Sequence, residues 1–318
     1  MGRYAPMRPL RFAVQVAVAP PGREWRERAR QLESLGYGTL VMPDHVVGGG
    51  LASFPALAAA AASTSRLRLG NLVLANDFRN PLLLAREALT VDLLSDGRLE
   101  LGLGAGWHTR DYESLGIPYD GGGVRVDRLA ESLALLKRLF TEDEVTHHGA
   151  HYRLEQAVAL PKAVQRPHPP IMVAGGGKRI LALAAREADI AGLAPRTDAK
   201  GELSRAELAL ASVERKIAHV LAAAGQRYPG ALELNILVFD TIVTDDRARA
   251  VAETAQRLGV DAAVVDGSPH FLFGTLAEIG AQIERTRDRL GITYFSVRGA
   301  HVDALAPLAR ELGERAGR

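Results

Sequence analysis

The sequence predicts one eight-stranded parallel β/α barrel (a TIM barrel) with insertions, and two observations carry this prediction. Short apolar runs alternate with longer amphipathic segments along the 318 residues, and the alternation supplies eight strands. Strands that alternate with helices indicate a parallel sheet whose two faces are covered by helices. No linker divides the chain, so residues 1–318 are expected to form a single domain. A doubly wound open sheet is the alternative, although it usually needs fewer units.

The expected strands are short apolar runs, and the expected helices carry apolar residues on one face. The strands cover Arg11–Ala19, Thr39–Pro43, Leu67–Ala75, Arg98–Leu103, Pro170–Ala174, Asp189–Leu193, part of Leu232–Val243, and Thr293–Val297. The helices cover Arg23–Leu35, Ala52–Ser63, Leu82–Leu94, Asp127–Phe140, Lys178–Glu187, Leu203–Ala223, residues 245–259, Leu276–Leu290 and Val302–Leu312. Thr244 is the expected N-cap of its helix, which Gly259 ends.

Three stretches are expected to be insertions: residues 141–169, 194–202 and 261–274. The first contains Val145–Leu154, which resembles a β-hairpin around His148–Gly149. Because the loops after the strands build the active site of a barrel, the other two insertions are predicted substrate walls.

Composition excludes several classes of protein. The chain has no cysteine, which rules out disulfides, a thiol nucleophile and cysteine-ligated metal centres. A net charge of +2 is too small to indicate a nucleic-acid partner, although it favours a small anionic ligand. The sequence contains no apolar run of about twenty residues, so no membrane span is predicted. The polar segment Met1–Leu10 has no signal-peptide pattern, so a cytoplasmic location is expected.

The first candidate motif is Leu101–Trp107, at the end of the fourth strand. Gly102, Gly104 and Gly106 let the backbone approach a flat ligand closely. A dinucleotide-binding fingerprint does not fit, because the third glycine comes one residue early and three β/α units precede it. Barrel packing alone is the other explanation for these glycines.

The second motif is Val173–Arg179, between the fifth strand and its helix. Three consecutive glycines at a helix N-terminus expose N–H groups to an anion such as phosphate, and Lys178 or Arg179 adds positive charge. A strand–helix turn without a ligand is the alternative.

The third motif is Pro43–His45, at the end of the second strand. A carboxylate beside an imidazole can order the ring and exchange a proton. Asp44 and His45 as anchors of a loop are the alternative.

These motifs, taken together, resemble the luciferase-like superfamily, which includes flavin monooxygenases and deazaflavin-dependent oxidoreductases. The resemblance is most specific over Leu69–Gly106, where G-x-x-V-L, R-N-P, L-A, T-x-D-x-L-S-x-G-R and L-G-L-G-A-G-W follow in that order. It continues through PDH at 43–45, PIMVAGGG at 170–177 and FGTLAEI at 273–279, and so covers nearly the whole chain.

The resemblance implies roles for particular residues of the cofactor site. Leu72 and Val73 match a bulge of the third strand, where a non-proline cis peptide supports the tricyclic ring. The residues matched to the rest of the cofactor site are Asp44 and His45 beside the ring, Ala75 and Asn76 beyond the bulge, and Ala174, Gly175, Gly176 and Gly177 around the phosphate.

One departure from the family's pattern concerns the substrate. Trp107 stands where sugar-phosphate dehydrogenases of the family have a catalytic acid, and Arg110 stands where they have an amide. A sugar-phosphate dehydrogenase is therefore not expected, and Trp107 offers an aromatic wall for a less polar substrate.

Weaker candidates also surround the predicted site. Gln15, His108, Arg110 and Arg298 are expected to contact substrate, although Gln15 as a satisfied core amide and Arg298 as a structural ion pair are equally compatible with the sequence. No metal site is predicted: the histidines of 147–151 lie on a hairpin without ligands at metal-binding spacing.

The main functional prediction is a coenzyme F420-dependent oxidoreductase that transfers a hydride between the deazaflavin and a small organic substrate, with His45 as the catalytic residue. An FMN-dependent monooxygenase, supplied by a flavin reductase and consuming oxygen, is the first alternative. A barrel that binds a ligand without turnover is the second. Family members are often dimers, so a homodimer is expected.

Overall fold

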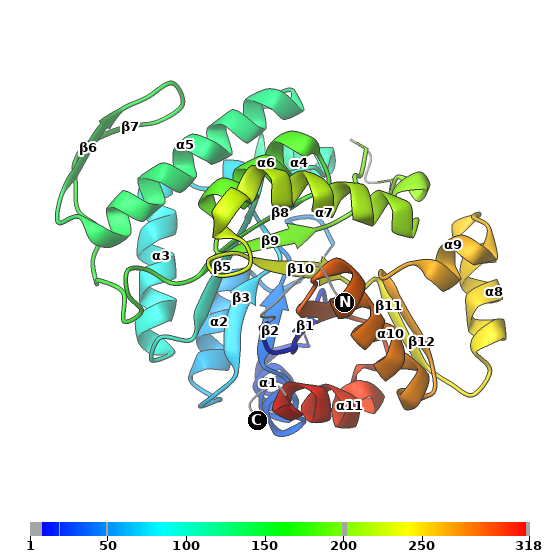
Figure 1. Ribbon diagram of the computed structural model, residues 1–318. Coiled ribbons are helices and arrows are strands. Elements are labelled where there is room, and N and C mark those ends of the chain that lie inside the picture. Colours follow the sequence, from blue (N-terminus) through cyan, green and yellow to red (C-terminus); the bar gives the residue numbers. More distant parts are fainter. Residues whose placement is uncertain (1–7, 19, 49, 199–201, 316–318) are drawn as a thin grey trace.

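Eight parallel strands close into a barrel in the computed structural model, which describes residues 8–18, 20–48, 50–198 and 202–315 (Figure 1). The barrel strands are β1 Arg11–Gln15, β2 Thr39–Met42, β3 Arg68–Asn71 with its continuation β4 Leu74–Ala75, β5 Leu99–Gly104, β8 Ile171–Gly175, β9 Ile190–Leu193, β10 Glu233–Leu237 and β13 Tyr294–Val297. They pair in this order, and β13 pairs with β1 to close the barrel. The predicted fold class is confirmed, and the open doubly wound sheet is wrong.

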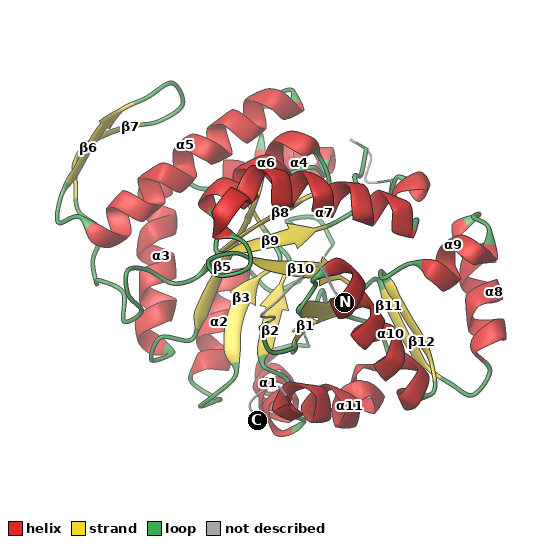
Figure 2. Ribbon diagram, in the orientation of Figure 1, coloured by secondary structure: helices red, strands yellow, loops and turns green. Residues whose placement is uncertain are grey.

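Helices cover the outside of the barrel, as the alternating pattern predicts (Figure 2). They are α1 Gly22–Ser34, α2 Ser53–Ala61, α3 Pro81–Leu94, α4 Thr109–Leu115, α5 Gly122–Thr141, α6 Lys178–Glu187, α7 Leu210–Ala224, α8 Arg247–Leu258, α9 Ala262–Gly267, α10 Leu276–Leu290 and α11 Val302–Arg315. Three expected helix starts are wrong. The helix expected from Asp127 begins five residues earlier, at Gly122. The helix expected from Leu203 begins at Leu210, because Arg205–Glu207 forms a 3₁₀ turn. Asp246 caps α8 in place of Thr244, because the Asp246 carboxylate accepts the Arg249 N–H.

The predicted hairpin is present, whereas one predicted strand divides into two. β6 Val145–His148 and β7 Arg153–Ala157 form the antiparallel hairpin beside α5 (Figure 1). The segment expected to hold one strand contains β10 and also β11 Asp240–Val243, which pairs outside the barrel with β12 Phe271–Gly274. Residues 199–201 of the second insertion lie outside the described residues, and the substrate-wall role of 194–202 and 261–274 stays a prediction.

Two layers of side chains fill the barrel interior. The lower layer is charged: Arg11 contacts Glu100 and Glu233 at 2.6 Å each, and Arg68 contacts Glu100 at 2.6 Å. The upper layer is apolar, and it comprises Ala13, Val41, Leu72, Met172, Ala174 and Ile190, with Val73 and Leu237 partly buried against it. Tyr294 joins the two layers, because its ring packs with these side chains while its hydroxyl donates to Glu100 at 3.1 Å. Because the interior is filled, the carboxyl ends of the strands are the face on which a ligand can lie.

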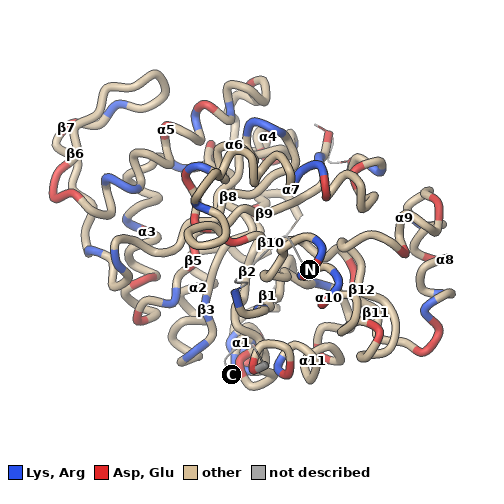
Figure 3. The backbone as a smooth tube through the Cα atoms, viewed as in Figure 1, with Lys and Arg blue, Asp and Glu red and all other residues tan. Residues whose placement is uncertain are grey.

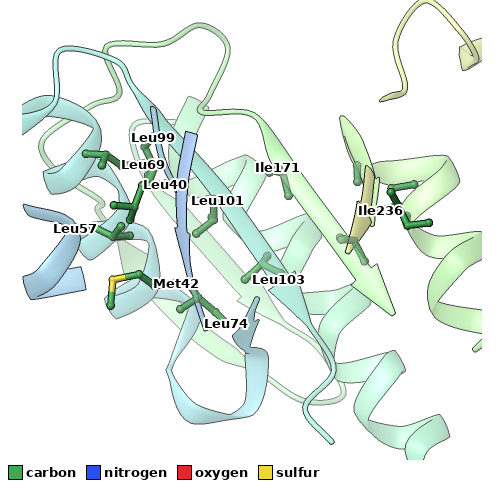
Figure 4. Close-up of a cluster of buried hydrophobic side chains, with 14 of the residues drawn as sticks. Leu40, Met42, Leu57, Leu69, Leu74, Leu99, Leu101, Leu103, Ile171 and Ile236 are labelled. Carbon is green, nitrogen blue, oxygen red and sulfur yellow. The ribbon is translucent and has the colours of Figure 1, made fainter. Parts of the chain in front are cut away.

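A second apolar core separates the sheet from the surrounding helices. Figure 4 shows part of it, with side chains from strands and from α2 packed together: Leu40, Met42, Leu57, Leu69, Leu74, Leu99, Leu101, Leu103, Ile171 and Ile236. Acidic and basic residues are interleaved over the outer helices (Figure 3). Among the described residues, no helix combines the length and the hydropathy that spanning a membrane requires.

Candidate cofactor and active site

The third barrel strand is interrupted at the mouth of the barrel. The peptide bond between Leu72 and Val73 is cis, although neither residue is proline, and this is the bulge that the resemblance implies. Leu72 is buried and Val73 is half-buried, and both belong to the apolar upper layer. The bulge therefore contributes an apolar floor to the mouth, of the kind that suits one face of a planar ring.

The glycines at the end of β5 make room for this bulge. A Cβ at Gly102 would lie 1.8 Å from the Asn71 carbonyl oxygen, and one at Gly104 would lie 2.7 Å from Val73 Cγ2. The expectation that these two glycines let the backbone approach a ligand is therefore wrong, since the neighbouring strand occupies that space. They contribute to the site indirectly, because the absence of Cβ atoms leaves room for the bulge at Leu72–Val73.

Gln15 connects the first strand to the bulge. Its side chain is buried, and Nε2 donates to the Leu72 carbonyl oxygen at 2.9 Å. Its Oε1 is buried and accepts no hydrogen bond. Because a buried acceptor without a donor costs free energy, Oε1 is a candidate acceptor for an N–H group of a ligand.

Asp44 braces the chain beyond the bulge. Arg79 donates to its two carboxylate oxygens at 2.5 and 2.8 Å, and the Ala75 N–H donates at 3.2 Å. The Asp44 side chain is 9% exposed. Its carboxylate thus holds the segment that follows the bulge, which matches the loop-anchoring alternative; a cofactor contact of Asp44 stays a prediction.

Ala75 and Asn76 differ in what they present to the mouth. Ala75 is half-buried, whereas the Asn76 side chain is fully buried. Asn76 Nδ2 donates to the Tyr152 hydroxyl at 3.0 Å, which turns the amide towards the hairpin. Its Oδ1 is buried and accepts no hydrogen bond, so this oxygen and the main chain are the parts of Asn76 that remain for a cofactor contact.

The glycine loop after β8 ends at the N-terminus of α6. A Cβ at Gly176 would lie 2.6 Å from the Arg196 nitrogen, so the chain after β9 packs directly against this loop. Gly177 is the N-cap residue of α6, and a Cβ there would have no heavy atom within 4 Å. Open space before a helix N-terminus is a suitable place for a phosphate. Arg179 is engaged by Asp127 at 2.5 Å, so its charge is already paired.

His45 lies in a cluster built from the loops after β2 and β5. Its Nδ1 is 2.7 Å from Asp111 Oδ2, and the His108 Nδ1 is 3.2 Å from the same oxygen. The rings of His45 and Trp107 meet edge to face with centroids 5.2 Å apart. The His45 side chain is 39% exposed, whereas that of Asp111 is 2% exposed. One ring edge of His45 is thus tied to a buried carboxylate while the other is open.

Asp111 is the site residue that sequence reasoning missed. Its Oδ1 accepts the N–H groups of Val46 at 3.0 Å and Val47 at 2.8 Å, so it also holds the backbone after His45. The available signal was its spacing from His108, since positions i and i+3 come together at the start of a helix. The side-chain ligand atoms of His45, His108 and Asp111 lie within 4.8 Å of one another. A hydrogen bond joins His45 to Asp111, whereas His108 Nδ1 is buried and has no hydrogen-bond partner.

The remaining candidates line the outer part of the mouth. Trp107 is 36% exposed, and the Tyr119 hydroxyl donates to its carbonyl oxygen at 2.9 Å. Arg110 is exposed on the first turn of α4. Arg298 is half-buried; its Nε donates to the Phe239 carbonyl oxygen at 3.1 Å, and burial lowers its pKa. No ion pair of Arg298 is found in the described part of the chain, although the charge of Asp240 acts on its guanidinium from a longer distance.

The closed barrel, the bulged third strand and the glycine loop define a class of β/α barrels that bind a cofactor at the mouth. The chain belongs to the luciferase-like monooxygenase family, because the family model matches residues 7–293.

Curated relatives of this chain include an uncharacterised protein, an F420-dependent dehydrogenase and an FMNH2-dependent monooxygenase. An uncharacterised protein of Mycobacterium tuberculosis is 34% identical over 184 residues, which cover 51% of this chain and 64% of the relative. An F420-dependent glucose-6-phosphate dehydrogenase of Intrasporangium calvum is 31% identical over 176 residues, 52% of each chain. An FMNH2-dependent dimethylsulfone monooxygenase of Pseudomonas putida is 30% identical over 128 residues, 40% of this chain and 35% of the relative. The matches span less than two thirds of these relatives.

Solved structures extend the similarity to the whole fold. The F420-dependent tetrahydromethanopterin reductase of Methanopyrus kandleri has a TM-score of 0.76 at 15% identity, over 96% of this chain and 98% of that one. An F420-dependent secondary alcohol dehydrogenase has a TM-score of 0.75 at 18% identity, over 98% and 99%. At these identities the likeness establishes the fold.

Proposed function

We propose that this chain is an oxidoreductase that uses coenzyme F420 and transfers a hydride between the deazaflavin and a small organic substrate. The observation that carries the proposal is the position of the open His45 ring at the mouth, where the bulge at Leu72–Val73 supplies an apolar floor. Curated relatives that are named as F420-dependent dehydrogenases support it.

The residues at the mouth fit a deazaflavin. The apolar floor suits one face of the ring, and the unpaired Gln15 Oε1 suits an N–H group of the ring edge. The open helix N-terminus at Gly177 suits the phosphate. When bound, the deazaflavin supplies the hydride chemistry.

The chain's own residues position the substrate and handle its proton. His45 is our proposed acid–base residue, because one ring edge is held by Asp111 and the other is open to the mouth. Trp107 forms an aromatic wall beside it, which limits water access and favours a less polar substrate than a sugar phosphate.

The alternative is an FMN-dependent monooxygenase that needs a flavin reductase as a partner and consumes oxygen. The Pseudomonas putida relative favours it. The same floor and glycine loop would accept the isoalloxazine ring and its phosphate, so cofactor choice is a matter for measurement.

The test compares the two cofactors directly. Purified protein is titrated with F420 and with FMN by fluorescence, then desalted, and the absorbance spectrum of the retained ligand is recorded. Retention of F420 supports the proposal, and no binding of F420 refutes it. Oxygen uptake with reduced FMN and a reductase would establish the alternative. Turnover of any substrate by the loaded protein would eliminate a barrel that only binds its ligand.

We further propose a homodimer in the cytoplasm. The residues that a second copy would cover are exposed apolar side chains of α3 and of the loop after the hairpin: Leu83, Leu93, Leu94, Val158, Leu160 and Val164. Light scattering at micromolar concentration checks the mass, and Leu83→Glu is expected to yield a monomer.

A further inference from the structure

One buried carboxylate on α4 binds three groups of the loop that follows β2. Asp111 Oδ1 accepts the N–H groups of Val46 and Val47, and Oδ2 lies 2.7 Å from His45 Nδ1. The partners are 64 to 66 positions away in the chain, so they meet only in the folded barrel. A carboxylate that is only 2% exposed and has three hydrogen-bonded partners is a structural part of the site.

The charge state of Asp111 determines the tautomer of His45. Burial by itself would raise the pKa of Asp111, but the hydrogen bonds from His45 and Val47 and the charge of the nearby imidazoles hold the pKa below its ordinary value. An ionised carboxylate can only accept hydrogen bonds. His45 Nδ1 must therefore carry a proton, which leaves Nε2 of the neutral ring as an acceptor.

The surroundings of His45 also restrict its rotation. Trp107 and His108 contact the ring edge to face, at centroid distances of 5.2 and 5.5 Å and interplanar angles of 80° and 82°. Asp111 and His108 are the titratable groups in contact with the ring in the described part of the chain. The exposed part of the ring is the edge that carries Nε2, because Nδ1 is turned to the buried carboxylate.

We propose that Asp111 is a positioning residue, which fixes His45 with Nδ1–H towards α4 and Nε2 towards the substrate. The inference rests on the proposed function, since it assigns the reacting proton to His45 Nε2. In a reduction, the protonated Nε2 donates its proton to the substrate atom beside the one that receives the hydride; in an oxidation, the neutral Nε2 accepts it. Asp111 touches neither substrate nor cofactor in this scheme and acts through the imidazole.

The first experiment measures Asp111→Asn in the F420-loaded enzyme. We expect kcat to fall by about a hundredfold or more, because an amide can present a donor to Nδ1 and so select the wrong tautomer. KM and the F420 dissociation constant should change by less than about threefold. The limb of the pH profile that reports His45 should move to lower pH, because loss of the anion destabilises the imidazolium. Asp111→Glu, which keeps the charge, should recover part of kcat.

The matched control is Glu113→Gln, which removes the same charge from an exposed position of the same helix. It should leave kcat and the pH profile unchanged. Thermal melting of each variant shows whether the fold is intact.

A second measurement is independent of the cofactor. Proton NMR of the protein should show a downfield resonance from the His45 Nδ1 proton, identified by its loss in His45→Gln. Asp111→Asn should remove this resonance, and Glu113→Gln should retain it. The inference is overturned if Asp111→Asn keeps both the resonance and the pH profile of the wild type. It is also overturned if metal analysis of wild-type protein purified without chelator finds one metal ion per chain. Wild-type protein that fails to bind F420 refutes the proposed function alone.

Discussion

Replacement of Gly177 by aspartate tests where the cofactor phosphate binds. Gly177 is the N-cap residue of α6 with φ −84° and ψ 152°, an extended conformation that any residue adopts. A Cβ at this position meets no heavy atom within 4 Å. Aspartate is also a favourable N-cap residue, so Gly177→Asp should be at least as stable as the wild type.

The expected loss of affinity follows from the added charge. A carboxylate roughly 5 Å from a phosphate repels it by about 3 kcal/mol at an effective dielectric constant of about 20. Gly177 is half-buried, so solvent and salt reduce this to about 1–2 kcal/mol. The dissociation constant for F420 should therefore rise about five- to thirtyfold.

Fluorescence titration of F420 at two salt concentrations measures the effect. Gly230→Asp is the matched control, because Gly230 is exposed, has open space around its Cβ position and lies in a turn between α7 and β10. The difference in F420 dissociation constant between the two variants should become smaller at high salt. If Gly177→Asp and Gly230→Asp bind F420 with equal affinity, the phosphate does not bind at the N-terminus of α6, and the reasoning fails.

Three further predictions concern the barrel and its mouth. Glu100→Gln should lower the free energy of unfolding in urea by about 1–3 kcal/mol, because the half-buried Arg11 and Arg68 would lose the buried carboxylate that both contact, while Arg11 keeps Glu233. His45→Gln should lower kcat of the F420-loaded enzyme by about a hundredfold or more while the F420 dissociation constant, measured by fluorescence, stays within about threefold. Burial lowers the pKa of His270 to about 4, so the folded state binds fewer protons than the unfolded state between about pH 6.5 and pH 4. The free energy of unfolding should therefore fall as the pH drops through this window. In His270→Gln, urea titrations at several pH values should show a smaller dependence of the free energy of unfolding on pH over the same window.

The sequence predicted the barrel well because each of its strands is a separate apolar run. Six of the eight expected strands contain the barrel strand that forms there, and the other two stop one residue short of the ends of β5 and β8. The interruption at Leu72–Val73, which the resemblance implied, is also present. The errors occur where one continuous apolar segment forms two strands that pair with different neighbours. Leu232–Val243 is one apolar segment, yet β10 pairs in the barrel and β11 pairs with β12 outside it. Pairing depends on residues distant in the chain, which periodicity does not contain.

The candidate site was predicted less completely, because its side chains have partners that the linear sequence does not reveal. Asp44 was singled out beside His45, but its carboxylate faces Arg79 and Ala75. The carboxylate that contacts His45 is Asp111, on the helix that follows β5, which lies two barrel strands from β2. Adjacent residues leave a strand in opposite directions, so neighbours in sequence are poor candidates for partners across a site.

The glycines of β5 show why a motif can be correctly located and yet misread. A glycine required by a ligand and a glycine required by a neighbouring strand look the same in sequence, since both reflect the absence of a Cβ. Here Gly102 and Gly104 face the Asn71 carbonyl oxygen and the Val73 side chain. A Gly102→Ala variant would therefore displace the bulge before it met any ligand. Loss of F420 binding in that variant would report damage to the floor of the site, whereas loss in Gly177→Asp would report repulsion of the phosphate. Stability separates the two, because only Gly102→Ala should lower the free energy of unfolding.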